Sequence, residues 1–184
     1  VRDYCAAWET CQRAKPALQR KRTVLHTLRP PVRRWSELQL DFVGPLPMTE
    51  RGHDAVLTVT DRATKMVHLI PLGFHGSEAL AVAKLLRDHV WKYHGMPTRI
   101  ISDRDSRFTS RVWTELCNLR HISQDMTTAY HPQGNGGAER TNQTMEVFLR
   151  IFADKFGKAG QADWDECLAM AEYAIHLKCL LPGH

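Results

Sequence analysis

Three carboxylates from separate parts of the chain have the types and positions that could hold hard divalent cations. Asp41 lies inside the apolar run "LQLDFV", where an aspartate is disfavoured unless it has a use. Asp103 ends a predicted strand, and Glu139 opens a predicted helix directly after the glycine-rich turn "QGNGG". No Cys or His pair accompanies them. Such an oxygen-rich set suits Mg²⁺ or Mn²⁺, and two such ions can promote phosphoryl transfer.

Glu139 also has a simpler interpretation. The helix expected over about 137–156 has an apolar stripe made of Met145, Phe148, Leu149, Phe152 and Phe156. At about 100° per residue, Glu139 falls on the polar face instead. A solvated face with an acid in the first turn, where the helix dipole favours negative charge, would explain this position without any chemistry.

Two further aspartates compete for a role in the site. In "IISDRDSRFTS", Asp105 follows Asp103 by two residues, so on an extended chain both would point to the same side. We expect Asp105 to shape the turn after the strand by hydrogen-bonding to its own backbone. We expect Asp61, at a predicted hairpin turn, to be structural.

The surrounding pattern predicts alternating strands and helices, which indicates an α/β fold with a mixed sheet covered by helices. Two β-branched runs around a turn at 62–64 predict an antiparallel hairpin. Ser77 is the expected N-cap of a helix that stops at Gly95 and Pro97. The other expected elements are strands over 38–43 and 99–102, an extended segment over 126–130, and helices over 110–119, 137–156 and 164–177.

Four stretches together carry a resemblance to a known family: "LQLDFVGPLP", "VTDRATKMVHLIPL", "GMPTRIISDRDSRFTS" and "TTAYHPQGNGGAERTNQTMEVFLR". In this order, over about residues 35–170, they resemble the integrase core of gypsy-class LTR retrotransposons, which is related to retroviral integrases. The 35 residues between Asp103 and Glu139 match the family's D,D-35-E spacing. The resemblance implies a ribonuclease H-like fold with a five-stranded mixed sheet.

The resemblance also implies a two-metal polynucleotidyl transferase, with Asp41, Asp103 and Glu139 as catalytic and metal-binding residues. Water would first trim the 3′ ends of the element's DNA, and the freed 3′-hydroxyl would then attack host DNA. Metal ions and positioning would carry the rate in such phosphoryl transfer.

Several polar residues are candidates for contacting DNA, each with a plainer alternative. His131 and Gln133 match the family's loop before the catalytic helix, or they form an ordered turn. The residues on the Glu139 face would contact phosphates or bases, or would remain solvated. Lys65 would contact a DNA phosphate or bulk water. These face residues are Asn142, Gln143 and Arg150.

The charge is concentrated at one end of the chain. Residues 1–36 carry a net charge of +7 while the remaining residues sum to −2. A basic arm favours a polyanion partner, although a solvated linker would have the same composition. With the resemblance, the expected partners are the element's DNA ends and target DNA, with a homo-oligomer as the working state. No apolar run approaches a membrane span, so we expect a soluble intracellular protein that acts in the nucleus.

The expected domains are a basic linker with a remnant of a zinc-binding module (1–34), the integrase catalytic core (35–178) and a truncated tail (179–184). Zinc is not expected, because Trp8 stands where the family has a cysteine, and Cys5 with Cys11 gives a poor spacing. These features suggest a truncated or host-captured copy. The alternatives are a catalytically lapsed DNA-binding or interaction module and a ribonuclease H-type nuclease for RNA–DNA hybrids.

Overall fold

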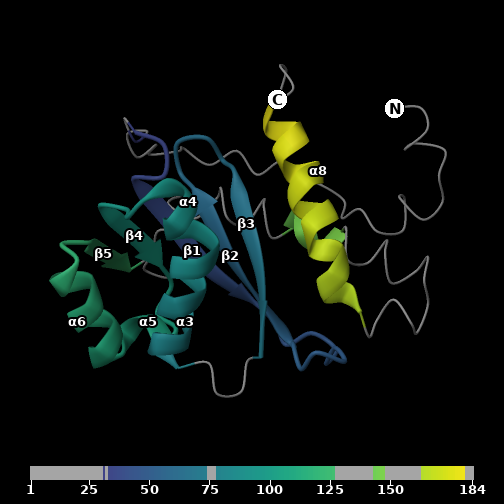
Figure 1. Cartoon of the computed structure of the whole chain (residues 1–184), viewed down its shortest axis with the longest axis horizontal. Helices are drawn as coiled ribbons and strands as arrows, with labels where there is room; N and C mark the ends of the chain where they lie inside the picture. The colour runs from purple at the N-terminus through teal and green to yellow at the C-terminus, as the bar shows by residue number, and fades with distance from the viewer. Residues whose placement is uncertain (1–30, 32, 74–77, 127–142, 148–162, 181–184) are drawn as a thin grey trace, which may run out of the picture.

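The fold is built on one five-stranded mixed sheet, seen in a computed structural model that describes residues 31, 33–73, 78–126, 143–147 and 163–180 (Figure 1). The strands lie in the order β3-β2-β1-β4-β5. β1 (Glu37–Val43), β2 (Ala55–Asp61) and β3 (Val67–Leu72) are antiparallel neighbours. β4 (Arg99–Ser102) runs parallel to β1, and β5 (Ser123–Met126) runs parallel to β4. The expected mixed sheet and hairpin are confirmed.

Helices cover both faces of this sheet. One face packs against α3 (Ala79–Leu86), which continues through the π-helical turn η1 (Arg87–Trp91) into α4 (Lys92–His94). The short α5 (Ser106–Thr109) and α6 (Arg111–Leu119) complete this layer (Figure 1). The other face packs against the helical residues 143–147, the 3₁₀ turn η3 (Trp164–Cys167) and α8 (Leu168–Leu180), which lies beside β3.

The alternation of side chains along β1 decides which residues meet which layer. Leu38 and Leu40 are buried in the core under α3 and α6. Because neighbouring side chains on a strand point to opposite faces, Asp41 faces the layer that holds Met145 and α8. β2 is buried along its whole length, since it has strands on both sides and helices on both faces. The sheet therefore presents Asp41 toward the helix that contains Met145.

The predicted helix boundaries that fall on described residues mostly agree with the structure, with two differences in the first helix. The N-cap is Glu78, which has an extended backbone and makes no side-chain capping hydrogen bond, and Ser77 lies outside the described residues. The expected start at Ser77 was therefore wrong. The π-helical turn is invisible in the sequence because an apolar stripe does not distinguish it from an α-helix. Gly95 ends the helix with φ +79°, a conformation that glycine tolerates.

Two elements differ more clearly from the prediction. β5 occupies Ser123–Met126, so the extended segment expected over 126–130 overlaps it only at Met126, and 127–130 lies outside the described residues. The short helix α5 was not expected at all. Of the long helix predicted over 137–156, the structure describes only 143–147, which is helical. In the described part of the chain, no helix has the length and apolarity to cross a membrane.

Candidate active site

Asp41 and Asp103 come from two neighbouring parallel strands. β1 pairs with β4 from Glu37↔Arg99 to Gln39↔Ile101. Asp41 lies two residues beyond Gln39, and Asp103 lies two residues beyond Ile101, so both follow the last shared pair by the same number of residues. The carboxyl ends of parallel strands are where α/β sheets place functional groups. The structure therefore brings these two predicted site residues to one end of the sheet.

Asp41 is half-buried near the end of β1, opposite Thr58 of β2. Its carboxylate Oδ1 accepts a hydrogen bond from the backbone N–H of Phe42 at 3.0 Å. Its carbonyl oxygen accepts one from the Thr58 hydroxyl at 3.2 Å. The strand pairing thus fixes the backbone of Asp41, and the contact with Phe42 orients its carboxylate.

Asp103 is exposed and lies just after β4, which ends at Ser102. Its Oδ1 accepts a hydrogen bond from the Asp105 backbone N–H at 3.1 Å. β4 ends before Asp103, so the strand on which the same-side expectation depended does not include either aspartate. The two aspartates belong to a tight turn in which one carboxylate receives the other residue's amide.

Asp105 has the turn role predicted for it. It is the N-cap of α5, and its Oδ1 accepts from the backbone N–H of Arg107 at 2.9 Å. The Arg107 guanidinium also binds both carboxylate oxygens, with contacts of 2.7 Å each. The hydrogen bond from this guanidinium is the main cause that lowers the pKa of Asp105, although partial burial opposes it. Asp105 is thus an ionised cap held by an arginine.

Arg107 was missed by reasoning from the sequence. Its side chain is 9% exposed, and its guanidinium carbon lies 3.4 Å from the centroid of the Phe42 ring. Phe42 also stacks on Phe108 with 5.0 Å between ring centroids. The local signal was an arginine two residues after a capping aspartate, but only the three-dimensional structure shows that Phe42 is its neighbour.

The remaining carboxylate of the predicted set, Glu139, lies outside the described residues, as do His131, Gln133, Asn142 and Arg150. Gln143 is exposed on the helical segment 143–147. In the same segment Met145 is fully buried in the core on the Asp41 face of the sheet. The segment that follows Glu139 therefore packs against the face that Asp41 presents.

Lys65 and Asp61 lie at the other end of the sheet. The register places Asp61 opposite Leu38 near the start of β1, and Lys65 is exposed in the turn that follows. Lys65 has φ +65° and donates its backbone N–H to the Asp61 carbonyl at 2.9 Å. The structure does not bring Lys65 together with Asp41 and Asp103, and its contact with DNA stays a prediction.

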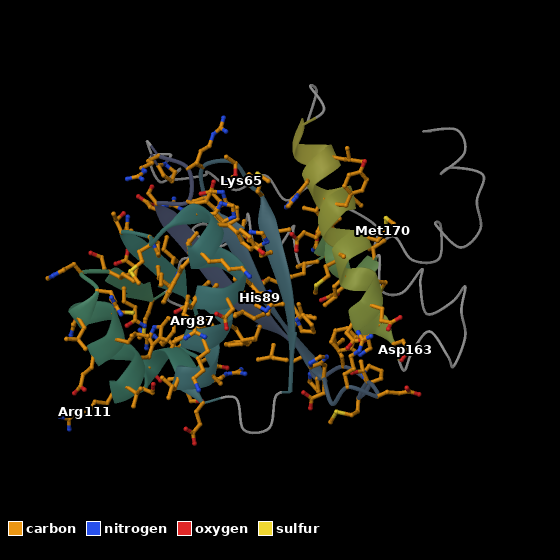
Figure 2. All side chains as sticks on the ribbon, viewed as in Figure 1. Lys65, Arg87, His89, Arg111, Asp163 and Met170 are labelled. Carbon is orange, nitrogen blue, oxygen red and sulfur yellow. The ribbon has the colours of Figure 1, made fainter. Side chains whose placement is uncertain are left out.

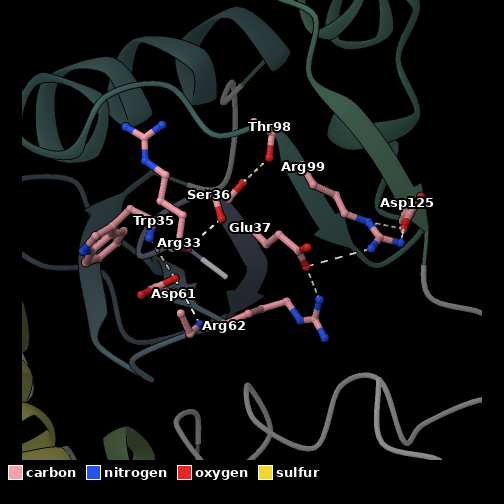
Figure 3. A network of polar contacts seen from close by, with 10 residues as sticks. Arg33, Trp35, Ser36, Glu37, Asp61, Arg62, Thr98, Arg99 and Asp125 are labelled. Carbon is pink, nitrogen blue, oxygen red and sulfur yellow. Dashed lines mark hydrogen bonds and ion pairs between the residues drawn. The ribbon is translucent and has the colours of Figure 1, made fainter. Parts of the chain in front are cut away.

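Asp61 is structural, as predicted. It is fully buried, and its carboxylate accepts backbone N–H groups from Trp35, Ala63 and Thr64 at 3.1, 3.2 and 3.1 Å. The Thr64 hydroxyl adds a fourth bond at 2.7 Å. Figure 3 shows the Trp35 contact within a larger network of polar residues at this end of the sheet. These donors occupy both oxygens of the carboxylate.

The five-stranded mixed sheet and the two aspartates at its strand ends are the features expected of an integrase core, and sequence comparison gives the same family. The chain belongs to the integrase core domain family, whose model matches residues 32–132. The match includes Asp41 and Asp103 and ends before Glu139.

Particular relatives are the Tf2-3 and Tf2-4 transposon polyproteins of Schizosaccharomyces pombe. Each is 33% identical over 150 residues, which are 82% of this chain and 11% of the relative. The chain thus spans about a tenth of the length of these curated relatives.

Solved structures with a similar fold are retroviral. A chain of the simian T-cell lymphotropic virus intasome, in complex with PP2A regulatory subunit B56 gamma, has a TM-score of 0.66 and 17% identity, covering 94% of this chain and 58% of that one. The HTLV-2 integrase catalytic core domain, in complex with magnesium and in a dimeric form, has a TM-score of 0.59 and 16% identity, covering 79% of this chain and 88% of that one. The fold is therefore ribonuclease H-like, as the resemblance implied.

Proposed function

We propose that this chain is an integrase-type catalytic core that hydrolyses DNA phosphodiester bonds and catalyses DNA strand transfer with the help of divalent metal ions. The observation that carries the proposal is the placement of Asp41 and Asp103 equally far beyond the shared register of β1 and β4. The core face next to Asp41 holds the helix that follows Glu139. Three carboxylates could therefore meet at one end of the sheet.

The chemistry of the donor groups fits Mg²⁺ or Mn²⁺. Within the described residues no three His, Cys, Asp or Glu side chains form a metal-binding group, and the third ligand that we propose, Glu139, lies outside them. Asp103 is exposed and can reach an incoming ion, and carboxylate oxygens are the preferred ligands of hard cations. Asp41, Asp103 and Glu139 would together hold the ions. When bound, the ions would neutralise charge on the phosphate and activate the attacking oxygen.

The protein's own contribution is positioning. The β1–β2 pairing holds Asp41, and the Asp103–Asp105 turn fixes the second carboxylate before any ligand arrives. Preorganised groups of this kind avoid reorganisation during reaction. Water would be the nucleophile for trimming DNA ends, and a DNA 3′-hydroxyl would be the nucleophile for strand transfer.

The proposed partners follow from the same function. The basic segment 1–36, with a net charge of +7, suits the DNA backbone, where binding releases counterions. His131, Gln133, Asn142, Gln143, Arg150 and Lys65 remain predicted DNA contacts. The HTLV-2 core with magnesium has been solved in a dimeric and in a trimeric form, which supports a homo-oligomer as the active form here. DNA integration would place the protein in the nucleus.

The test is a reversal assay with the full chain. Purified protein is incubated with Mn²⁺ or Mg²⁺ and a branched strand-transfer product, and released DNA strands are quantified. Asp103→Asn and Asp41→Asn should each lower product formation by at least about 100-fold, because each removes a charged ligand from the reacting centre.

Asp88→Asn is the matched control. Asp88 is an exposed acid of η1 whose carboxylate pairs with the adjacent Arg87, so activity should persist in this variant. If wild-type protein releases no more product than Asp103→Asn, the enzyme proposal is wrong. Retained DNA binding in that case would support the lapsed DNA-binding module instead.

A further inference from the structure

A continuous series of contacts joins the two candidate catalytic aspartates through Arg107. The Asp103 carboxylate accepts the Asp105 amide at 3.1 Å, and Arg107 binds both oxygens of Asp105 at 2.7 Å. The same guanidinium lies 3.4 Å from the centre of the Phe42 ring. The Phe42 amide donates to the Asp41 carboxylate at 3.0 Å.

The sheet itself does not supply this connection. Pairing between β1 and β4 covers Glu37–Gln39 and Arg99–Ile101, so the last residues of β1 pair with β2 but have passed the shared register with β4. Beyond that point the loop that carries Asp103 leaves the strand. Arg107 lies where β1 and the loop after β4 diverge, and it contacts Phe42 in β1 and Asp105 in the loop.

We propose that Arg107 is a positioning residue that sets the separation of the Asp41 and Asp103 carboxylates. This inference rests on the proposed function of those two aspartates. In this proposal Arg107 is not itself a metal ligand. It acts through Asp105 on one side and through the Phe42 ring on the other.

The chemistry of arginine explains why this residue type is needed. A guanidinium is planar, so its face can lie on an aromatic ring while its edge binds a carboxylate through two parallel hydrogen bonds. A lysine ammonium has the same charge but cannot make both contacts in one geometry. The guanidinium is also largely buried, where an electrostatic contact is stronger than at the surface. Arg107→Lys therefore keeps the positive charge but cannot contact the Phe42 ring and both Asp105 oxygens at the same time.

A purely structural role for Arg107 predicts something different. If Arg107 only capped and stabilised α5, its replacement would lower stability and leave the folded molecules with normal metal binding. If it sets the carboxylate separation, folded molecules should bind metal more weakly. Changes in residues that orient metal ligands typically lower affinity by 10- to 100-fold.

The experiment compares four forms of the full chain: wild type, Arg107→Lys, Phe42→Leu and Arg111→Lys. Arg111 is the matched control because its side chain is 91% exposed on α6 and pairs with Glu115. Figure 2 shows Arg111 at the edge of the molecule. Circular dichroism confirms folding, and Mn²⁺ binding is followed by the electron paramagnetic resonance signal of free Mn²⁺. Amide spectra of ¹⁵N-labelled protein report the Phe42 and Asp105 N–H groups, which donate to the two carboxylates.

We expect Arg107→Lys to weaken Mn²⁺ binding about tenfold or more and to shift both amide resonances. Phe42→Leu, which keeps an apolar side chain, should also weaken Mn²⁺ binding and shift the Asp105 amide, and Arg111→Lys should change neither the affinity nor the amides. A folded Arg107→Lys protein with wild-type Mn²⁺ affinity and unchanged amides would overturn the proposal. If Arg107→Lys does not fold, Phe42→Leu decides by the same criteria.

The two proposals can fail separately. If wild type and Asp103→Asn bind Mn²⁺ equally, the proposed function fails at its metal site. The amide resonances still test the inference, because they report the carboxylate contacts without any metal. Unshifted Phe42 and Asp105 amides in folded Arg107→Lys would then reject the positioning role.

Discussion

The acidic residues at the two ends of the sheet differ in their hydrogen-bond partners and in their exposure to solvent. At the end where β1 and β4 begin, each acidic side chain either pairs with an arginine or accepts hydrogen bonds from several backbone N–H groups (Figure 3). Glu37 contacts Arg62 and lies 3.9 Å from Arg99, whose Nε donates to Asp125 at 2.6 Å. Asp61, fully buried beside them, accepts four hydrogen bonds.

At the end where β1 and β4 stop, Asp105 is likewise held by an arginine, but the two candidate ligands Asp41 and Asp103 have local contacts of another kind. Asp41 and Asp103 each accept a backbone N–H from a residue one or two positions further along the chain. Asp103 is exposed, whereas Asp61 is not. A buried carboxylate needs several donors to offset its lost hydration, but an exposed one keeps oxygens in reach of solvent and ligands. Exposure therefore separates Asp103, a candidate ligand, from the buried and structural Asp61.

The largest expected difference between the ends is in stability. Asp61→Ala should lower the free energy of unfolding by about 3 kcal/mol or more, because three backbone N–H groups and a hydroxyl lose a charged acceptor. Urea denaturation followed by circular dichroism measures this change.

Asp103→Ala is the paired control at the opposite end. It removes one hydrogen bond from an exposed carboxylate, so the free energy of unfolding should change by about 1 kcal/mol or less. Equal destabilisation by the two substitutions would show that the contrast between the ends is wrong.

A smaller effect is expected at the hairpin turn that surrounds Asp61. The Thr64 hydroxyl donates to Asp61 at 2.7 Å and accepts the Met66 amide at 3.2 Å. Thr64→Val removes both bonds at nearly constant shape and should cost about 1–2 kcal/mol in the same denaturation assay.

Thr114→Val provides the comparison for Thr64. Thr114 is exposed on α6, and its hydroxyl donates to the Ser110 carbonyl at 3.2 Å. Its replacement should change stability by about 0.5 kcal/mol or less. If Thr64→Val is equally mild, the turn does not depend on the hydroxyl contact with Asp61.

Strands with a clear apolar pattern could be predicted from sequence, and those without one could not. β2 and β3 are β-branched runs around a turn, and both faces are buried against apolar layers. β5 reads "SQDM" and has partly exposed side chains, since it is an edge strand whose pairing comes from β4. Its position depends on a distant strand and leaves no local signature, so the extended segment was placed too late.

For the candidate site, the sequence likewise predicted some residues, Asp103 and Asp105, but not others, Arg107 and Phe42. The preference for Asp103 over Asp105 came from the spacing to Glu139, and the structure supports the division of roles through the cap that Asp105 forms on α5. Arg107 and Phe42 could not be paired in advance, because 64 residues separate them and their contact lies beyond the last residues that β1 and β4 pair. Sequence order reveals candidate ligands better than it reveals the residues that position them.

The smallest expected effect concerns a histidine near the acid-rich end. His94 stacks on Trp35 with 3.7 Å between ring centroids, and its Nε2 lies 2.9 Å from Nε2 of His68. Burial lowers the pKa of His94 below its ordinary value of 6.5, His68 lowers it further, and the Asp61 charge opposes both. Removing that charge with Asp61→Asn should lower the His94 pKa further, whereas Asp103→Asn should leave it unchanged.

The sign of the pH effect on stability follows from this shift. Because the folded-state pKa of His94 lies below 6.5, the unfolded chain binds more protons as the pH falls, and the folded state loses stability below about pH 6.5. The loss continues until the pH passes the lowered folded-state pKa. Titration of the His94 ring by NMR, in wild type and both asparagine variants, measures the pKa directly. An unchanged His94 pKa in Asp61→Asn would mean that the buried Asp61 charge acts only through its hydrogen bonds and does not reach the neighbouring histidine.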